Sequence, residues 1–207
     1  APRSGRLPLS FAQQRLWFLE QLGNLGSAYY IRASLRLRGE LDRAALVRAL
    51  DGIVARHEAL RTTFAEVDGV PEQRIAPADA GFHLVEHDLG GPLPLSPRNE
   101  RGGGRGEGPE AELGRWMAEE ARAPFDLRRG PLIRGRLIRL AADDHVLLLT
   151  MHHIVSDGWS TGVLLDELRA LYAAFVRGAG DPLPPLPVQY ADYAAWQRRW
   201  MDGEVLE

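Results

Sequence analysis

The sequence predicts an α/β fold in which several helices pack against a sheet. The chain has 207 residues, 45% of them hydrophobic, which is enough to bury such a core. Residues 145–151 are apolar at both alternating positions, as in a strand that is covered on both faces. Leucine and aromatic side chains then recur at helical spacing from Leu164 to Phe175, and Gly178 supplies a helix stop.

The N-terminal third predicts two helices separated by a strand. Residues 1–7 indicate the tail of a linker, and Ser10 with Gln13 forms the capping-box pattern that begins a helix. That first helix carries a broad apolar surface made of Phe11, Leu16, Trp17, Phe18, Leu19 and Leu22. Alternation over residues 29–37 predicts a strand, and Asp42 begins the second helix. The buried stripe of the second helix consists of Leu46, Ala49, Leu50, Ile53 and Val54.

The middle third predicts strands and a helix around one long loop. Asp68-Gly69 favours a hairpin turn, and residues 82–85 and 132–140 predict two strands, the second paired with the central strand. Residues 90–109 are rich in Gly, Pro, Arg and Glu, which is typical of a mobile loop and not of a domain boundary. We expect no catalytic role for this loop. Helical spacing resumes at Leu113, Trp116, Met117 and Ala121.

The C-terminal part predicts an extended connector followed by a last helix. Proline fixes φ and lacks an N–H, so the proline-rich residues 181–187 cannot continue the preceding helix. Residues 188–202 then predict a helix with an aromatic stripe of Tyr190, Tyr193, Trp196 and Trp200. Such a stripe belongs to a core more often than to a ligand-binding surface.

Composition excludes several functional classes. The net charge of −3 lacks the positive excess that is typical of domains that bind nucleic acid. The chain has no run of eighteen apolar residues and no signal peptide, so we expect a cytoplasmic protein without a membrane partner. All 25 basic residues are Arg and Cys is absent, which excludes a disulfide framework, a thiol nucleophile, a Walker-type phosphate loop and a lysine Schiff base.

The polar residues after the central strand are the strongest functional candidates. His152, His153, Asp157 and Gly158 fall within seven residues of one another. Histidine is the side chain best suited to move protons near neutral pH, and a carboxylate can hold a neighbouring group in place. Adjacent side chains of an extended segment point to opposite faces, so one histidine should face a reaction and the other should pack. Gly158 also lets a backbone N–H approach a ligand oxygen.

A purely structural role or a metal site would account less well for these residues. If both histidines were hydrogen-bonded core residues, their position at the strand end would be explained. The Asp and Gly that follow within a few residues would not. A metal site needs converging ligands. Adjacent histidines diverge, Cys is absent, and no other His, Asp and Glu set has ligand spacing, so we expect no metal.

Four segments together resemble the condensation domains of nonribosomal peptide synthetases, a family with the chloramphenicol acetyltransferase-like fold. Residues 151–160 resemble the family's HHxxxDG signature, which is its third motif. Residues 10–19, 56–64 and 190–196 resemble its first, second and fourth motifs. The motifs occur in family order over nearly the whole chain, which makes the resemblance specific.

The resemblance implies the N-terminal lobe of a chloramphenicol acetyltransferase-like α/β sandwich, with helices against a mixed sheet. Residues 1–180 would form the lobe, and residues 181–207 the proline-rich connector and first helix toward a C-terminal lobe. The family's later motifs, which lie in that second lobe, are missing from the sequence. We therefore expect the chain to be inactive alone and to expose aromatic surface at Tyr193, Trp196 and Trp200.

The reaction implied by the resemblance is acyl transfer that forms a peptide bond. A donor acyl or peptidyl thioester is attacked by the amine of an acceptor aminoacyl thioester, and each is delivered by a peptidyl carrier protein. The implied partners are these donor and acceptor carriers, the missing lobe and the neighbouring synthetase domains. The 4′-phosphopantetheine arms belong to the carriers, so the domain itself is expected to bind no cofactor.

The resemblance also distributes roles among eight residues. His153 acts at the reacting groups as a base on the amine, as a proton acceptor for the tetrahedral intermediate, or by orienting the nucleophile. The N–H of Gly158 lies near the developing oxyanion. Structural support comes from His152 and from an ion pair between Arg61 and Asp157. The residues expected to line the substrate channel are Arg15, Trp159 and Ser160.

Two alternatives remain open, and a third is disfavoured. An epimerisation domain also carries HHxxxDG and abstracts a Cα proton, but residues 10–17 have the condensation form of the first motif. A non-catalytic lobe that only docks carriers is disfavoured by the intact third motif and favoured by the missing second lobe. A heterocyclisation domain is disfavoured because its aspartate-based motif would replace both histidines.

Overall fold

The structure is a computed structural model in which residues 3, 5–23, 26–90 and 109–201 are described. The loop predicted at residues 90–109 lies outside this part except for its two end residues. No helix in the described part of the chain is long and apolar enough to cross a membrane.

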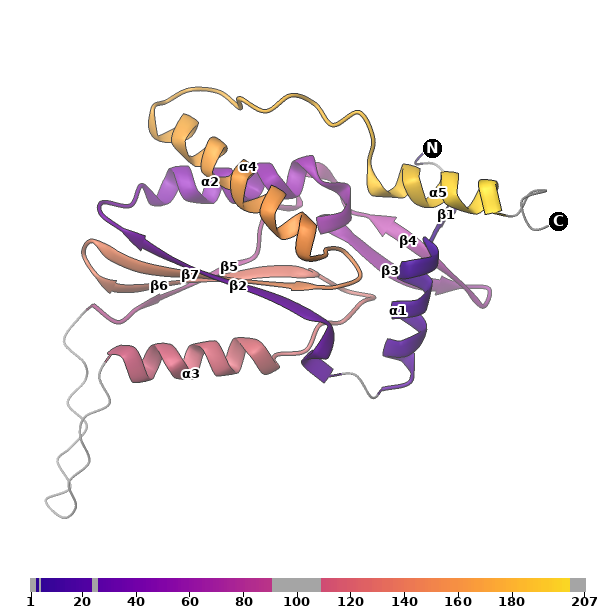
Figure 1. The fold of residues 1–207 in the computed structure, drawn as a ribbon, viewed down its shortest axis with the longest axis horizontal. Coiled ribbons are helices and arrows are strands. Elements are labelled where there is room, and N and C mark those ends of the chain that lie inside the picture. The colour runs from indigo at the N-terminus through magenta and orange to yellow at the C-terminus, as the bar shows by residue number, and fades with distance from the viewer. Residues whose placement is uncertain (1–2, 4, 24–25, 91–108, 202–207) are drawn as a thin grey trace, which may run out of the picture.

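A four-stranded mixed sheet forms the centre of the molecule (Figure 1). Its strand order is β2 (Tyr30–Arg38), β7 (Asp144–His152), β6 (Ile133–Ala141) and β5 (Leu84–Asp88). β7 pairs antiparallel with both β2 and β6, and β5 pairs parallel with β6. The predicted central strand and its predicted partner are therefore confirmed. β7 is buried from its second residue to its last, which explains why it lacks a polar face.

Two helices lie together on one face of this sheet, α2 (Arg43–Arg56) and α4 (Gly158–Val176) (Figure 1). Asp42 caps α2 as predicted, because its carboxylate accepts a hydrogen bond from the backbone N–H of Ala45 (2.9 Å). The core between these helices and the sheet is made of buried aliphatic side chains, including Leu46, Leu50, Ile53, Leu147, Leu149, Leu164, Leu168 and Leu171.

The opposite face is covered by α3 (Pro109–Arg122) (Figure 1). A smaller apolar cluster lies beneath it, formed by Leu113, Ile138, Val146 and Leu148. Met117, one of the residues that gave this helix its predicted spacing, is exposed. Glu120, about one turn further along α3, is buried and forms ion pairs with Arg134 and Arg136 of β6. A buried carboxylate can occupy a core position when it is paired in this way.

A separate three-stranded sheet has the order β1 (Leu7–Pro8), β4 (Val70–Ile75) and β3 (Thr62–Val67). The predicted hairpin joins β3 and β4, with positive φ at both turn residues, Asp68 (53°) and Gly69 (77°). The linker predicted at residues 1–7 is wrong at its last residue, because Leu7 belongs to β1 and is buried. Three short 3-10 helices complete the described elements, η1 (Gly26–Tyr29), η2 (Glu58–Arg61) and η3 (Ala78–Ala80).

The first helix, α1 (Phe11–Gln21), begins with the predicted capping box of Ser10 and Gln13. Its apolar surface is less buried than the sequence indicates, because Phe11, Phe18 and Leu22 are exposed. The buried residue of α1 is Gln13, whose amide donates to the carbonyl oxygen of Ile154 (3.5 Å). α1 therefore meets the segment after β7 through a polar side chain.

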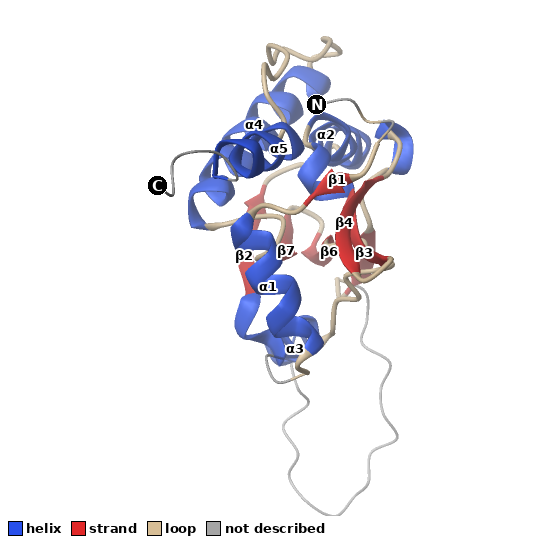
Figure 2. Ribbon diagram, turned by 90° about the vertical axis from the view of Figure 1, so that its right-hand side faces the viewer, coloured by secondary structure: helices blue, strands red, loops and turns tan. Residues whose placement is uncertain are grey.

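The last helix, α5 (Tyr190–Met201), lies beside the N-terminal segment (Figure 2). The backbone N–H of Phe11 donates to the side chain of Gln197 (3.0 Å), and the hydroxyls of Ser10 and Tyr190 share a hydrogen bond (3.0 Å). The aromatic stripe of α5 does not belong to the core: Tyr190, Tyr193, Trp196 and Trp200 are all exposed. The exposure expected at Tyr193, Trp196 and Trp200 is therefore confirmed, whereas the core role that such a stripe more often has does not apply.

Candidate active site

His152 is carried into the core by the end of β7. Its backbone N–H donates to the carbonyl oxygen of Leu132 (2.9 Å), and its side chain is only 1% exposed. The imidazole packs against the rings of Tyr30 and Phe125, with centroid distances of 5.7 and 6.1 Å. His152 is therefore held in place by backbone pairing and by aromatic packing.

The hydrogen bonding of the His152 ring defines its tautomer. The backbone N–H of Ile154 donates to its Nδ1 (3.1 Å), so in the neutral ring the proton is on Nε2. Burial, and then the nearby His153, lower the pKa of His152 to about 4. His152 is consequently neutral at pH 7 and supports the turn after β7 from inside the core.

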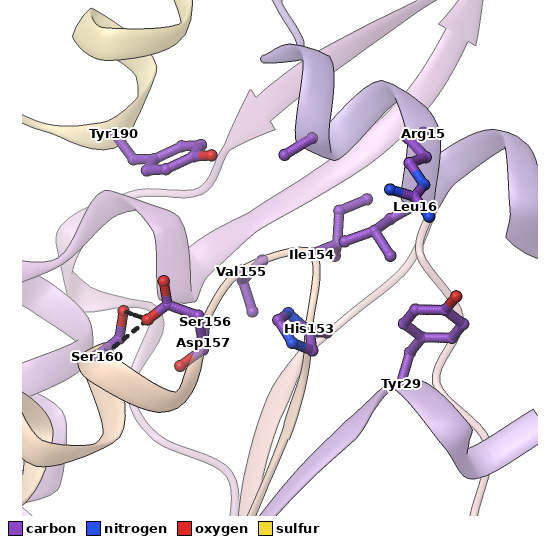
Figure 3. Close-up of a pocket in the computed structure, with 11 residues that line it drawn as sticks. Arg15, Leu16, Tyr29, His153, Ile154, Val155, Ser156, Asp157, Ser160 and Tyr190 are labelled. Carbon is purple, nitrogen blue, oxygen red and sulfur yellow. Dashed lines mark hydrogen bonds between the residues drawn. The ribbon is translucent and has the colours of Figure 1, made fainter.

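His153 is exposed, in contrast to the buried His152. Figure 3 shows its ring among the residues that line a pocket. Its backbone N–H donates to the carbonyl oxygen of Tyr29 (2.8 Å), and the two rings meet edge to face at 6.4 Å. The side chain borders a pocket of about 350 Å³, here called the His153 pocket. The expected divergence of the two histidines is confirmed. The pocket is lined by Ala12, Arg15, Leu16, Tyr29, His153, Ile154, Val155, Ser156, Asp157, Ser160 and Tyr190.

Asp157 is the N-cap of α4. Its Oδ1 accepts hydrogen bonds from the backbone N–H (2.8 Å) and the hydroxyl (2.6 Å) of Ser160. These bonds lower the pKa of the Asp157 carboxyl. The Asp157-Gly158 pair therefore starts a helix, because a side-chain oxygen at this position satisfies N–H groups that the first turn leaves free.

The expected ion pair between Arg61 and Asp157 is wrong. The Arg61 guanidinium donates to the carbonyl oxygens of Ala76 and Ala55 and lies 4.0 Å from Glu58. The carboxylate of Asp157 is exposed and turned toward its own helix. Backbone carbonyls accept from the two terminal nitrogens of Arg61, while its Nε is buried without a hydrogen-bond partner among the described residues. Arg61 therefore joins α2 to the end of β4 instead of joining the second motif to the third.

The structure brings only some of the remaining candidates to the His153 pocket. Arg15 of α1 and Ser160 of α4 line it, as Figure 3 shows. Gly158 is the first residue of α4, and a Cβ placed on it would meet no atom within 4 Å. Trp159 is 84% exposed and borders a neighbouring pocket. The channel role expected of Trp159 therefore concerns that second pocket.

Two tyrosines in the His153 pocket were not predicted as site residues. Tyr29 comes from the segment before β2, and Tyr190 from the first turn of α5. Burial raises the pKa of Tyr190, and its hydroxyl is bonded to Ser10. Tyr190 belongs to the fourth motif, which was an available signal, but its aromatic spacing pointed to a core.

This arrangement suits proton transfer and anion stabilisation. An exposed imidazole borders the pocket within a few residues of the N-terminus of α4, a helix of 19 residues. Helix N-termini favour negative charge, and histidine exchanges protons near neutral pH. Among the described residues, no group of three His, Cys, Asp or Glu side chains is placed to hold a metal ion.

A model of the family described as "Condensation domain" matches residues 3–206. The chain belongs to the condensation-domain family. The match includes the segments at residues 10–19, 56–64, 151–160 and 190–196, and the mixed α/β architecture is that of one lobe of the chloramphenicol acetyltransferase-like fold.

Curated relatives of this condensation-domain chain are synthetases. It is 52% identical over 206 residues to malpibaldin synthetase of Mortierella alpina, covering 99% of the chain and 3% of that protein. It is 50% identical over 206 residues to a linear gramicidin synthase of Brevibacillus parabrevis, covering 100% of the chain and 2% of that protein. The condensation-domain chain thus spans a small part of each relative.

Solved structures share the fold. The X-domain from teicoplanin biosynthesis is 35% identical with a TM-score of 0.82, and the match covers 99% of this chain and 40% of that one. The first condensation domain of the calcium-dependent antibiotic synthetase is 29% identical with a TM-score of 0.77, covering 97% of this chain and 45% of that one. The condensation-domain chain therefore matches less than half of each solved chain.

Proposed function

We propose that the chain is the N-terminal lobe of a two-lobed condensation domain that forms peptide bonds in nonribosomal peptide synthesis. The donor is an acyl or peptidyl thioester, and the acceptor is the amine of an aminoacyl thioester. One observation carries the proposal: His153 is exposed in a pocket beside the N-terminus of α4, while the adjacent His152 is buried. Membership of the condensation-domain family supports the reaction class.

In this proposal His153 works on the acceptor amine. An α-amine has an ordinary pKa of about 7.7–8.0, so roughly a tenth is already neutral at pH 7. Orientation of the amine therefore matters as much as its deprotonation. Nucleophilic attack forms the C–N bond and a tetrahedral oxyanion. The amine's extra proton leaves through His153 or the solvent, and collapse of the intermediate expels the donor carrier's thiolate, which is reprotonated.

We assign stabilisation of the oxyanion to the N-terminus of α4. Gly158 is its first residue, and the space next to its Cα is open to a ligand oxygen. A preorganised N–H donor acts most strongly where charge develops in the transition state. Asp157 supports this role by capping the helix, which fixes the direction of its first turn.

The substrates would arrive on partner proteins. We propose donor and acceptor peptidyl carrier proteins whose 4′-phosphopantetheine arms reach the His153 pocket, where Arg15 lies on the side of α1. The lobe itself would hold no cofactor. The curated relatives are much longer synthetases of which this chain matches a small share, which supports neighbouring synthetase domains as further partners.

The second lobe is an essential part of the proposal. Two tethered substrates must be held in line, and the described residues give the His153 pocket walls from one lobe only. The solved relatives are more than twice as long as this chain. The exposed aromatic side chains of α5 also form a surface that a second lobe would cover.

The experiment is an amide-formation assay with the two-lobed domain and two loaded carriers. Wild type should form the dipeptidyl product with unchanged stereochemistry, and His153→Ala should lose most turnover. His83→Ala, at an exposed histidine away from the His153 pocket, is the matched control. Inversion of the donor residue without amide formation would support the epimerisation alternative instead.

A second candidate is a non-catalytic docking platform. One solved relative, 34% identical to this chain, is described as a complex of the X-domain with OxyB from teicoplanin biosynthesis, so this architecture also serves as a binding partner. A wild-type domain that binds loaded carriers but forms no amide would favour the platform. The exposed His153 favours catalysis.

A further inference from the structure

A second pocket adjoins the His153 pocket. It has a volume of about 250 Å³ and lies between the start of α4, η2 and the connector before α5. We call it the connector pocket. Its lining residues are His57, Ala59, Leu60, Val155, Ser156, Trp159, Ser160, Val163, Leu164, Leu186, Val188, Gln189 and Tyr190. Four of these also line the His153 pocket, namely Val155, Ser156, Ser160 and Tyr190.

The walls of the connector pocket are mostly aliphatic and come from separate elements. Leu60 belongs to η2, Leu164 and Val163 to α4, and Leu186 and Val188 to the connector. Leu164 is buried, whereas Val163 is 40% exposed and Val188 is 59% exposed. These exposed aliphatic side chains surround a concave site. Their burial beneath an apolar group is favourable, because it removes apolar surface from water.

Four polar side chains of the pocket are already engaged by protein groups, namely those of His57, Gln189, Ser160 and Tyr190. His57 Nε2 lies 2.5 Å from a carboxylate oxygen of Glu167. The Gln189 amide accepts from the backbone N–H of Glu58 (3.1 Å) and donates to the carbonyl oxygen of Arg56 (2.8 Å).

Ser160 of α4 and Tyr190 of α5 are engaged in the same way. The Ser160 hydroxyl donates to Asp157, and the Tyr190 hydroxyl is bonded to Ser10. Ser156 stands in the wall shared with the His153 pocket. Apart from Ser156 and the exposed Trp159, the polar side chains that line the connector pocket are already bonded to protein groups. A polar group entering it would therefore lose its water and gain few partners, which is unfavourable.

We propose that the connector pocket receives the aliphatic side chain of an aminoacyl group whose reacting end lies beside His153. This inference rests on the proposed function and adds a substrate class to it. The volume is below the range of about 300–1,000 Å³ typical of pockets for whole ligands, which suits one side chain. A pantetheine arm carries amides and a hydroxyl, so the engaged polar walls disfavour it as the occupant.

The test uses the two-lobed domain and one wall position. Val163→Trp fills the connector pocket, and Val176→Trp changes an exposed valine of α4 outside it. Carriers loaded with leucine or glycine are compared, first as donor and then as acceptor, to show which substrate supplies the side chain. For leucine in the responsive position, kcat/KM should fall about 10-fold or more, because one methylene in an apolar pocket changes it by about 10- to 200-fold. Glycine should be little affected, and Val176→Trp should behave as wild type.

Two outcomes would overturn the inference. An equal loss for leucine and glycine would mean that the pocket holds the arm common to all substrates, and no loss with either would mean that no substrate uses it. Val188→Trp repeats the test from the connector if Val163→Trp lowers the melting temperature.

A direct binding measurement separates this inference from the proposed function. Leucyl-pantetheine amide should shift the methyl NMR signals of Leu164 and Leu186, and glycyl-pantetheine amide should not. Leucine-selective shifts in a wild-type domain that forms no amide would refute the proposed reaction and leave the pocket's preference standing. Equal shifts with both probes would refute the preference.

Discussion

Nε2 of His152 lies 3.9 Å from Oε2 of Glu20, between the end of β7 and the last turn of α1. The distance exceeds that of a hydrogen bond, and Nε2 has no hydrogen-bond partner within the described part of the chain. Since Nδ1 accepts from Ile154, the neutral ring directs an N–H toward a carboxyl group whose pKa is raised by burial. Because burial keeps the His152 ring neutral, protonation would place a charge in the core, and the stability of the fold should be sensitive to mild acid.

The free energy of unfolding should fall between about pH 6.5 and pH 4. The pKa of folded His152 is about 4, while an unfolded histidine titrates near 6.5, so the unfolded chain binds the additional proton in this window. The loss should be on the order of 3 kcal/mol. Urea unfolding at a series of pH values measures it. His152→Gln should remove this part of the pH dependence while leaving the acid loss below pH 4 that comes from carboxylates such as Asp157.

Replacement of the two histidines should separate stability from activity. His152→Ala leaves the backbone N–H of Ile154 without its acceptor and opens a cavity, so it should lower the free energy of unfolding by roughly 2–5 kcal/mol. His153→Ala should leave stability nearly unchanged and abolish most amide formation by the two-lobed domain. Thermal unfolding and turnover are measured for both variants. Near-normal turnover with His153→Ala beside a loss confined to His152→Ala would contradict the assignment.

Asp157 should behave as a helix cap. Asp157→Ala should lower the free energy of unfolding by about 1 kcal/mol, and Asp157→Asn should have little effect because Asn caps equally well. Arg61→Ala should cost about 1.5–3 kcal/mol, because it removes charged donors from Ala76 and Ala55. A double-mutant cycle should give a coupling energy near zero. Strong coupling would instead support a direct ion pair between Arg61 and Asp157, which the structure does not show.

The 207-residue chain should form no amide when it is assayed alone with both loaded carriers. Activity should appear when the separately produced second lobe is added. The chain alone should also self-associate through the stacked rings of Trp196 and Trp200, whose centroids lie 5.7 Å apart. Sedimentation velocity measures this, and Trp196→Ser with Trp200→Ser should reduce it. Robust turnover by the isolated chain would refute the need for a second lobe.

The parts of the fold that depend on local pattern were predictable from the sequence. β7 was identified because burial on both faces leaves neither face polar, and the cap of α1 because Ser10 and Gln13 interact within one turn. The divergence of His152 and His153 followed from strand geometry.

The features that depend on distant contacts were not predictable in the same way. Arg61 has several acceptors within reach, and the choice of Ala76 over Asp157 depends on how η2 meets the end of β4. Tyr190 has the same helical spacing whether its side of α5 is covered or exposed. Glu120 lies on an otherwise apolar side of α3 because two arginines of a distant strand pair with it.

The hydrogen bond between Ser10 and Tyr190 has a consequence for the order of folding. The two residues are 180 positions apart, and α5 is the last described helix to leave the ribosome. The cap of α1 can form within one turn as soon as it is synthesised, but its contact with α5 closes a loop of nearly the whole lobe. Contacts of such large sequence separation form slowly, because the chain loses the entropy of closing a long loop before the contact stabilises the fold. One wall of the His153 pocket, supplied by Tyr190, is therefore completed only after the rest of the lobe has folded.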